Sequence, residues 1–356
     1  MKNFSELDIL ARELSAWSEL DGESIFITGG TGFFGSSFLY SLLKVKQEHQ
    51  LNIDITILTR SIKTFKHNHP LLFESSFIHC LQGDVVDFIF PEKKFSKIFH
   101  LATTSAHETF HGESQLKKYK TLVNGTERLL KFAVKCNANK ILFTSSGVVY
   151  GPLPDGMTTV AETYNGSPVT TEPASALAQG KRSAEFLIAY YADKYGFEYV
   201  IARCFSFVGP FLPLDLHYAI GNFIYDALYK DVIEIKGDGS PIRSYLDVDD
   251  LTVWLLIMMS KKCKHKVYNV GSDQSISILE LAEKVCGIIA PEKRLKVCGD
   301  TNHIVGNFSR DYYVPNINRA KNELGLDVWI DLSQAINRMK KSVIKNIAPQ
   351  QIKTTI

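Results

Sequence analysis

Three observations predict an α/β fold in which a doubly wound parallel sheet is joined to a smaller, interleaved C-terminal α/β domain. From Ile25 onward, short apolar runs bounded by turn residues alternate with segments of helical periodicity. A glycine-rich turn separates the first apolar run from the first long helical segment. Past Gly209 this alternation loosens into turn-rich stretches such as GDGSPIRSYLDVDD, where we expect the smaller domain to begin.

The predicted elements follow one another at the spacing of a parallel sheet. A short amphipathic helix over residues 5–17, with Ser5 as its N-cap, precedes the first strand. The expected strands are 24–28, 53–59, 76–85, 97–103, 140–146 and 199–209. The expected helices that follow are 36–45, 125–137, 180–196, 219–230 and 277–289. Because helices separate successive strands, we expect these strands to be parallel.

Composition indicates an ordinary soluble globular protein. The 356 residues suffice for one large domain or two intimately joined ones. Hydrophobic residues make up 45% and charged residues 22%, and the net charge is only +2 without any basic block. These values give no support to binding of nucleic acid or of an anionic membrane, so we expect neither partner.

Three local features favour a cytoplasmic location. The six cysteines lie far apart and never in C-x-x-C spacing, which predicts buried, reduced thiols rather than disulfides or a metal site. The N-terminal segment mixes charged residues into its apolar positions and therefore lacks the core of a signal peptide. The longest apolar run, VWLLIMM over 253–259, is too short to span a bilayer.

The stretch SIFITGGTGFFGSSFL places Gly29, Gly32 and Gly35 between a strand and a helix. One glycine permits the tight turn, one lets the backbone approach a pyrophosphate, and one lets the helix pack closely on the strand. The helix N-terminus adds unpaired N–H groups and the positive end of its dipole. The turn therefore predicts a dinucleotide site. Its expected contacts are Gly29, Thr31, Gly32, Phe33, Phe34 and Gly35.

The end of the second strand bears on which dinucleotide binds. Thr59 and Arg60 stand there, without the carboxylate that an NAD site usually offers to the ribose 2′-hydroxyl. Arg60 can meet the 2′-phosphate of NADP, stack on adenine or be solvated, so NAD or NADP is expected with a lean to NADP. Asp84 is placed to accept from the adenine amino group or to close an ordinary turn. Further cofactor contacts are expected from Val85, Leu101 and Ala102.

Taken together, these segments resemble the extended short-chain dehydrogenase/reductase family, in particular its nucleotide-sugar epimerases, dehydratases and reductases. The matching pieces are TGGTGFFG, GDV, FHLAT, LFTSSGVVYG, GKRSAE, RCFSFVGP, GDGSPIRSYLDVDDL and YNVGS, in the family's order across most of residues 24–275. The resemblance implies a Rossmann domain that binds the dinucleotide and a second domain that binds a nucleotide diphosphate sugar. The expected division is 1–23 as an N-terminal helical extension, 24–208 plus 242–270 as the first domain, 209–241 plus 271–345 as the second, and 346–356 as a tail.

The resemblance also implies a catalytic Ser, Tyr and Lys. In the family the Tyr exchanges a proton with the sugar hydroxyl, the Lys lowers the pKa of the Tyr and binds the nicotinamide ribose, and the Ser binds the sugar oxygen. By motif these are Ser146 and Lys181, but the Tyr position holds Leu177, which can neither donate nor accept a proton. Dehydratases of the family place an Asp–Glu pair where this chain has Gly147 and Val148, so a 4,6-dehydratase is not expected.

Leu177 leaves three interpretations open. Another group replaces the tyrosine; or the protein binds cofactor and nucleotide sugar without turnover; or the leucine was introduced to disable the enzyme. We favour the first, an NAD(P)-dependent epimerase or keto-sugar oxidoreductase with an atypical active site, over a silent binder. The candidate replacements are Tyr150, Tyr164, His217 and Tyr218.

Further residues are implied on the substrate side. By resemblance, Thr104, Ser105 and Tyr150 line the sugar pocket. Arg243 suits the diphosphate, unless it pairs with Asp247 or Asp250, and Asn222 is a similar candidate.

Three more expectations concern the surface and the assembly. Arg319 is expected on a solvated helix face. His107, Glu108 and His111 cluster in one loop, but we expect no metal. A homodimer through helices over 126–136 and 180–196 is implied by the resemblance.

Overall fold

Seven parallel strands form the central sheet of the protein, whose computed structural model describes residues 14–104, 112–216, 218–299 and 312–351. The strands are β1 (Ser24–Thr28), β2 (Asp54–Thr59), β3 (Ile78–Gln82), β4 (Lys97–His100), β5 (Lys140–Ser146), β6 (Glu198–Cys204) and β11 (Val267–Val270). Their order across the sheet is β11-β6-β5-β4-β1-β2-β3. The winding therefore reverses between β1 and β4, which is where doubly wound sheets bind ligands.

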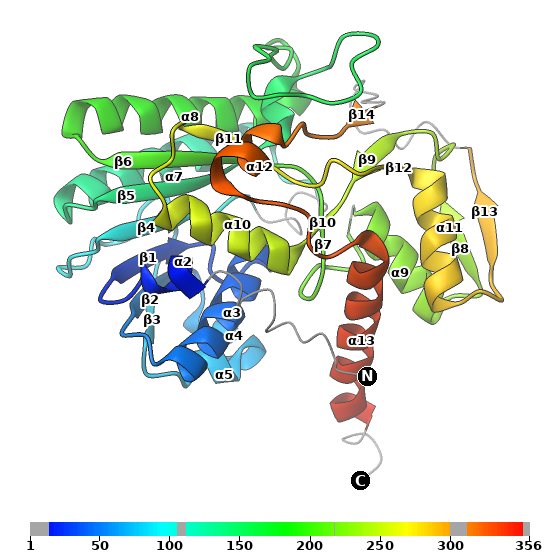
Figure 1. Cartoon of the computed structure of the whole chain (residues 1–356), viewed down its shortest axis with the longest axis horizontal. Coiled ribbons are helices and arrows are strands. Elements are labelled where there is room, and N and C mark those ends of the chain that lie inside the picture. The colour runs from blue at the N-terminus through cyan, green and yellow to red at the C-terminus, as the bar shows by residue number, and fades with distance from the viewer. Residues whose placement is uncertain (1–13, 105–111, 217, 300–311, 352–356) are drawn as a thin grey trace.

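Helices cover both faces of this sheet (Figure 1). The helices α7 (Gln115–Lys135) and α8 (Ala176–Tyr195) pack together on one face, and α3 (Phe33–His49), α10 (Val248–Ser260) and α2 (Leu14–Ser18) pack on the other. The short helices α4 (Ile62–Asn68) and α5 (Pro70–Phe73) lie against β3. The predicted α/β fold with a parallel Rossmann sheet is confirmed.

Strand β1 shows how the sequence builds these two layers. Ile25 and Ile27 belong to the hydrophobic core that also contains residues of α3 and α10, whereas Phe26 between them belongs to the core that contains residues of α7. Successive side chains of a strand point to opposite faces, so a strand covered on both faces must be apolar throughout. The continuous apolar run SIFIT is therefore a central parallel strand.

A second part of the chain lies beside the sheet (Figure 1). Its helices α9 (Ala219–Tyr229), α11 (Ile278–Ile289) and α13 (Leu332–Gln351) share a separate core with the parallel pair β8 (Val232–Ile235) and β13 (Arg294–Val297). Two small ladders join it to the first part. In the first ladder, β9 (Ile242–Ser244) pairs with the antiparallel strand β12 (Ser275–Ser277) on one side and with the parallel strand β14 (Tyr312–Tyr313) on the other. In the second ladder, β7 (Phe207–Val208) pairs with β10 (Leu246–Asp247). The helix α12 (Asn318–Leu324) then returns to β11.

Some elements differ in extent from the sequence-based expectation. The strand expected over 199–209 is divided, because the chain leaves the central sheet after Cys204 and β7 pairs with β10 instead. The helix expected over 5–17 is described from Leu14 to Ser18, and Ser5 lies outside the described residues. The helix α13 continues to Gln351, into the segment expected to be a tail.

The structure also bears on the membrane and thiol expectations. Within the described ranges, no helix combines the length and the apolarity that a bilayer crossing requires. All six cysteines are free thiols. Cys136, Cys204 and Cys286 are buried as expected, whereas Cys298 is exposed.

Candidate active site

The glycine turn joins β1 to α3 at the carboxyl end of the sheet. Gly29 has a φ of +74°, and a Cβ on it would lie 2.6 Å from the backbone nitrogen of Ala102. A Cβ on Gly35 would collide with the carbonyl oxygen of Gly29. A Cβ on Gly32 would make only an ordinary contact, 3.5 Å from the Gly29 carbonyl oxygen, and no side chain of the described residues caps α3 there. The first N–H groups of α3 therefore stay available to an anion, and the turn fits a dinucleotide pyrophosphate.

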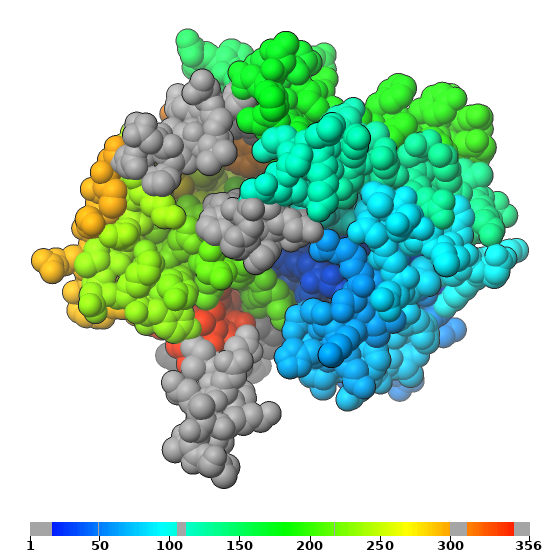
Figure 2. Space-filling view, turned by 180° about the vertical axis from the view of Figure 1, so that it is seen from behind, coloured from blue at the N-terminus to red at the C-terminus, as the bar shows by residue number. Residues whose placement is uncertain are grey.

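The residues that follow β4 lie beside the glycine turn. Leu101 and Ala102 lie against the glycine turn, and the Ala102 N–H donates to Thr28 Oγ1 at 3.3 Å. His100 lies between the hydroxyls of Thr28 at 2.8 Å and Thr126 at 3.0 Å. Burial lowers its pKa to about 3, so the imidazole is neutral. In Figure 2 the dark blue N-terminal segment lies recessed between the cyan part and the yellow-green second part.

The ends of β2 and β3 carry the residues predicted for the adenosine half. Thr59 is buried, and its hydroxyl oxygen accepts from the backbone of Ser61 at 3.3 Å. Arg60, the next residue, is exposed. The Asp84 carboxylate accepts from the Val86 N–H at 3.2 Å and so closes a turn, one of its two expected roles. Because β2 and β3 are neighbours, Arg60 and Asp84 lie at adjacent strand ends.

Four further predicted cofactor contacts lie around the same crevice. Val85 packs on α7, where a Cβ on Gly125 would lie 2.8 Å from it. Phe33 and Phe34 begin α3 with their ring centres 5.5 Å apart, and the Phe34 ring meets that of Phe207 edge-on at 4.8 Å. Thr31, before them, is exposed. Phe34 thus packs the start of α3 against β7.

Lys181 reaches the end of β5 from α8 and is buried. Its Nζ donates to the Thr144 carbonyl at 2.6 Å and lies 4.6 Å from the centre of the Phe143 ring. Burial lowers the pKa of this amine to about 8. Leu177 lies one turn earlier on the same face of α8 and is half-buried. An apolar side chain therefore occupies the position at which the resemblance implies a tyrosine.

Ser146 ends β5, two residues beyond the carbonyl that Lys181 binds. Its Oγ accepts from the Val148 N–H at 3.3 Å. The neighbouring Ser145 donates to Glu185 at 2.5 Å, and Glu185 accepts two hydrogen bonds from Arg203 at 3.1 and 2.7 Å. This mostly buried ion pair ties α8, which carries Lys181, to β6 beside Ser146.

A residue that the sequence reasoning missed also lies at Ser146. The Tyr313 hydroxyl, from β14, is 3.3 Å from Ser146 Oγ and 3.5 Å from the carbonyl oxygen of Cys204. Its ring packs on Phe205 with the centroids 4.7 Å apart. Ser146 and Tyr313 are 167 positions apart, and the surrounding YYVP carries no motif that would have marked the tyrosine.

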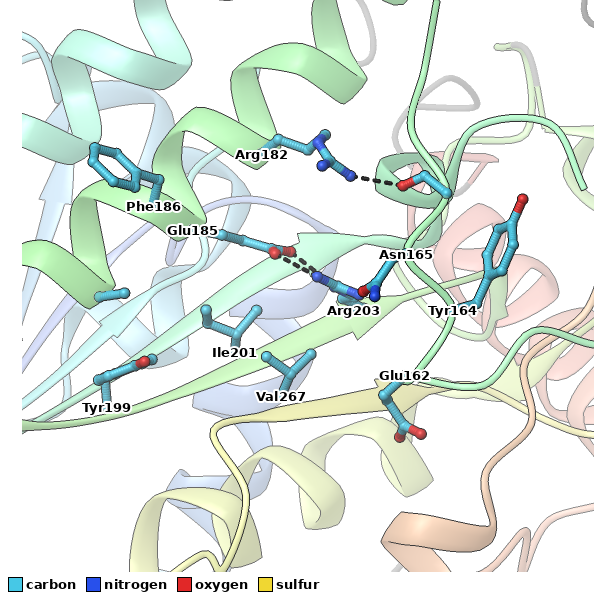
Figure 3. A pocket seen from close by; sticks show the side chains of 12 residues that line it. Glu162, Tyr164, Asn165, Arg182, Glu185, Phe186, Tyr199, Ile201, Arg203 and Val267 are labelled. Atoms are coloured by element: carbon cyan, nitrogen blue, oxygen red, sulfur yellow. Dashed lines mark hydrogen bonds and ion pairs between the residues drawn. The ribbon is translucent and has the colours of Figure 1, made fainter.

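The tyrosines that the sequence offers in place of a tyrosine at position 177 contact other groups. The Tyr150 hydroxyl donates to Asn269 Oδ1 at 2.7 Å, and burial raises its pKa to about 12. Tyr164 donates to the Pro152 carbonyl at 3.4 Å and lines a cavity of about 510 Å³ (Figure 3). That cavity lies between α8 and the strands β6 and β11, and neither Ser146 nor Lys181 lines it. Tyr218 packs against the core of the second part.

The predicted substrate residues are spread over both parts of the molecule. Thr104 is buried just beyond β4. Asn222 is half-buried on α9, and Arg243 is half-buried on β9, where it donates to its neighbour's carbonyl at 2.8 Å. Asp247, an alternative partner for Arg243, pairs with Arg338 at 2.7 Å.

Some expectations fall outside the described residues or are wrong. Five of the residues named from the sequence lie outside the described residues: Ser105, His107, Glu108, His111 and His217. Arg319 is not on a solvated face, because its side chain is only 17% exposed. It donates to the Val267 carbonyl at 2.8 Å and lies 3.7 Å from the Glu162 carboxylate. The packing of α12 against β11 turns this arginine inward.

Comparisons with known proteins agree with this geometry. The model of the NAD dependent epimerase/dehydratase family matches residues 25–271. UDP-glucuronic acid decarboxylase 6 of Arabidopsis thaliana is 30% identical over 320 residues, which cover 89% of this chain and 88% of that protein. UDP-glucose 4-epimerase of Thermotoga maritima, solved with UDP-glucose, superposes with a TM-score of 0.75 at 21% identity, over 91% of this chain and 99% of that one. UDP-glucuronic acid 4-epimerase of Bacillus cereus, solved with UDP-glucuronic acid and NAD, gives 0.74 at 20% identity over the same shares.

Proposed function

The chain belongs to the NAD dependent epimerase/dehydratase family, and on that premise we propose that it is an enzyme that uses NAD(P) to modify the sugar of a nucleotide diphosphate sugar. The reaction class that we assign is epimerisation or oxidation–reduction at a sugar carbon. One observation carries the proposal: the glycine turn, Ser146 and Lys181 all lie at the carboxyl end of the same parallel sheet.

The cofactor assignment is supported by the turn between β1 and α3. When bound, the nicotinamide would supply the two-electron redox chemistry of the reaction. The N-terminus of α3 would hold the pyrophosphate, and Lys181 would hydrogen-bond the nicotinamide ribose. The sequence at the end of β2 offers Thr59 and the exposed Arg60 rather than an Asp or Glu, which favours NADP. Calorimetric titration with NAD and NADP, repeated on Arg60→Ala, tests this preference.

The substrate assignment is supported by the relatives and by the polar groups around the crevice. A UDP-sugar is the substrate class that the named relatives share. Ser146 would hold the reacting sugar oxygen, and Thr104, Ser105 and Tyr150 would line the sugar pocket. Arg243 and Asn222 would hold the diphosphate, a role that suits a guanidinium with several donors. Gly147 and Val148 leave no acid–base pair beside Ser146, which argues against dehydration.

A second candidate function is supported by Leu177. If no group replaces the missing tyrosine, the chain binds NAD(P) and a nucleotide sugar without turning it over. Loss of a general acid–base group typically lowers the rate by ~10²–10⁴-fold, so the two candidates differ measurably in turnover.

One experiment separates the two candidates. The purified protein is incubated with NAD or NADP and with UDP-glucose, UDP-N-acetylglucosamine, UDP-glucuronic acid or dTDP-glucose, and the sugars are followed by NMR and mass spectrometry. A new epimer, or loss of two hydrogens with matching cofactor reduction, is the expected result. Unchanged sugars, with binding of one of them and turnover that appears in Leu177→Tyr, would establish the silent binder instead.

The assembly and the location are part of the same proposal. The outward face of α8 exposes Phe186 and Tyr190, at 68% and 51%, beside α7. Burial of this face against a second copy would form a homodimer through residues 126–136 and 180–196. Phe186→Asp should then convert the dimer to a monomer in light scattering, and an unchanged mass would refute this interface. Free thiols throughout support a cytoplasmic location.

A further inference from the structure

Two positions depart from the family pattern, and one of them, Gly147, lies against Tyr313. Position 177 lacks a hydroxyl, and position 147 lacks any side chain. A Cβ on Gly147 would lie 2.9 Å from the Tyr313 hydroxyl and 2.7 Å from the Phe205 ring. Any side chain at 147 would therefore push Tyr313 away from Ser146. Gly147 therefore leaves space for the Tyr313 hydroxyl beside Ser146, in a site whose position 177 has no hydroxyl.

The two hydrogen bonds of the Tyr313 hydroxyl are long enough for a substrate oxygen to replace one of them. Its contacts with Ser146 Oγ at 3.3 Å and with the Cys204 carbonyl at 3.5 Å are long for an O–H donor, for which about 2.7–2.8 Å is usual. A sugar oxygen that approaches Ser146 can therefore take over either contact. The ring itself is held in place by Phe205 and by the pairing of β14 with β9.

From this geometry we infer that the Tyr313 hydroxyl, and not a group at position 177, takes the proton of the sugar hydroxyl and returns it. The inference rests on the proposed function. In the forward step the O–H bond of the sugar breaks and an O–H bond forms on the Tyr313 phenolate. The C–H bond of the same sugar carbon would break as well, its hydrogen leaving with the electron pair as a hydride to the oxidised nicotinamide when that cofactor is bound, and return of hydride and proton restores both groups.

Cations in the surrounding elements favour the phenolate. Arg243 is the register partner of Tyr313 in the parallel pair of β9 and β14, so the two side chains share one face of that small sheet. Lys181 lies at the end of β5, against the Thr144 carbonyl. A nearby positive charge stabilises the ionised form of an acid. The titratable residues of the elements that contact Tyr313 include Arg243 of β9, Arg203 and Cys204 of β6, and Tyr150, which follows β5.

The adjacent tyrosine provides a matched control. Tyr312 is on the same short strand and is 38% exposed, so Tyr312→Phe removes the same atom without touching Ser146. The wild type, Tyr313→Phe and Tyr312→Phe are compared in three measurements. These are turnover of the UDP-sugars, calorimetric binding of UDP-glucose and NAD, and the tyrosinate ultraviolet absorbance as a function of pH.

We expect Tyr313→Phe to lower kcat by ~10²–10⁴-fold, with ligand dissociation constants within about tenfold of the wild type. Tyr312→Phe should match the wild type. UDP-glucose binding should shift the tyrosinate titration of the wild type and of Tyr312→Phe, but not that of Tyr313→Phe.

The outcomes distinguish failure of this inference from failure of the proposed function. If the wild type turns over a sugar and Tyr313→Phe keeps its kcat within about threefold, the inference is overturned and the enzyme assignment stands. If the wild type turns over none, the enzyme assignment fails, and the tyrosinate titration decides the role of Tyr313. Identical ligand-induced shifts in wild type and Tyr313→Phe overturn that role.

A second variant covers the case in which Tyr313→Phe does not fold. Replacement of Tyr313 by 3-fluorotyrosine keeps the ring and the hydroxyl but makes the phenol more acidic. The acidic limb of the kcat–pH profile should then move to lower pH by the difference between the two phenol pKa values. An unmoved limb would overturn the inference.

Discussion

Removal of the buried lysine should change the pH dependence of stability in a way that the structure fixes in sign and size. Lys181 is 3% exposed, and burial lowers its pKa from 10.5 to about 8. Each pKa unit corresponds to about 1.4 kcal/mol, so the shift corresponds to about 3 kcal/mol of unfavourable interaction in the charged form. Lys181→Met removes the titrating group while keeping an unbranched side chain.

The sign follows from which state binds the proton. Below pH 8 the amine is protonated in both folded and unfolded chains, so its contribution does not vary with pH. Between pH 8 and 10.5 the unfolded lysine holds a proton that the folded one has lost. The free energy of unfolding of the wild type therefore rises with pH through this window, relative to that of Lys181→Met.

Urea unfolding at about pH 7 and about pH 9.5, in the presence of a reductant, measures this difference. We expect the free energy of unfolding of the wild type, minus that of Lys181→Met, to increase by about 2 kcal/mol between the two pH values. Groups common to both proteins cancel, and His100, with a pKa of about 3, titrates outside the window. Lys131→Met, at an exposed lysine of α7, should show no such change. A constant difference for Lys181→Met, or one that shrinks with pH, would refute the burial argument.

Three further predictions concern the glycine turn, the ion pair and the active-site glycine. Gly29→Ala should abolish NAD binding in calorimetry, because its Cβ meets backbone, whereas Gly196→Ala, with a similar φ of +79° but open space, should bind NAD normally. Glu185→Gln should lower the free energy of unfolding by about 3 kcal/mol in urea titrations, because it leaves Arg203 mostly buried without its carboxylate; a loss under about 1 kcal/mol would mean that the pair behaves as a solvent-exposed one. Gly147→Ala should lose turnover while NAD binding is retained, at a cost of about 1–3 kcal/mol in stability, and full activity would show that the crowding is relieved elsewhere.

The fold and the cofactor turn could be predicted because their signals are local. The strand–turn–helix unit from β1 to α3 is contiguous in sequence, and Gly29 and Gly35 in it stand where a side chain would collide with the backbone. The alternation of apolar runs with helical segments likewise reports burial on both faces of the sheet. Ser146 and Lys181 were located by motif, and α8 directs Lys181 at the end of β5.

The sequence by itself thus determined the parallel sheet, the glycine turn and the leucine at position 177, where the resemblance implies a tyrosine. Only the tertiary structure decided that Tyr313 lies at Ser146, that Tyr150 is committed to Asn269, and that Arg319 is turned inward. The physical reason is that these contacts depend on the register of short strands and on loop packing between distant segments. Such pairings leave no periodic pattern in the chain, whereas backbone turns and amphipathic faces do.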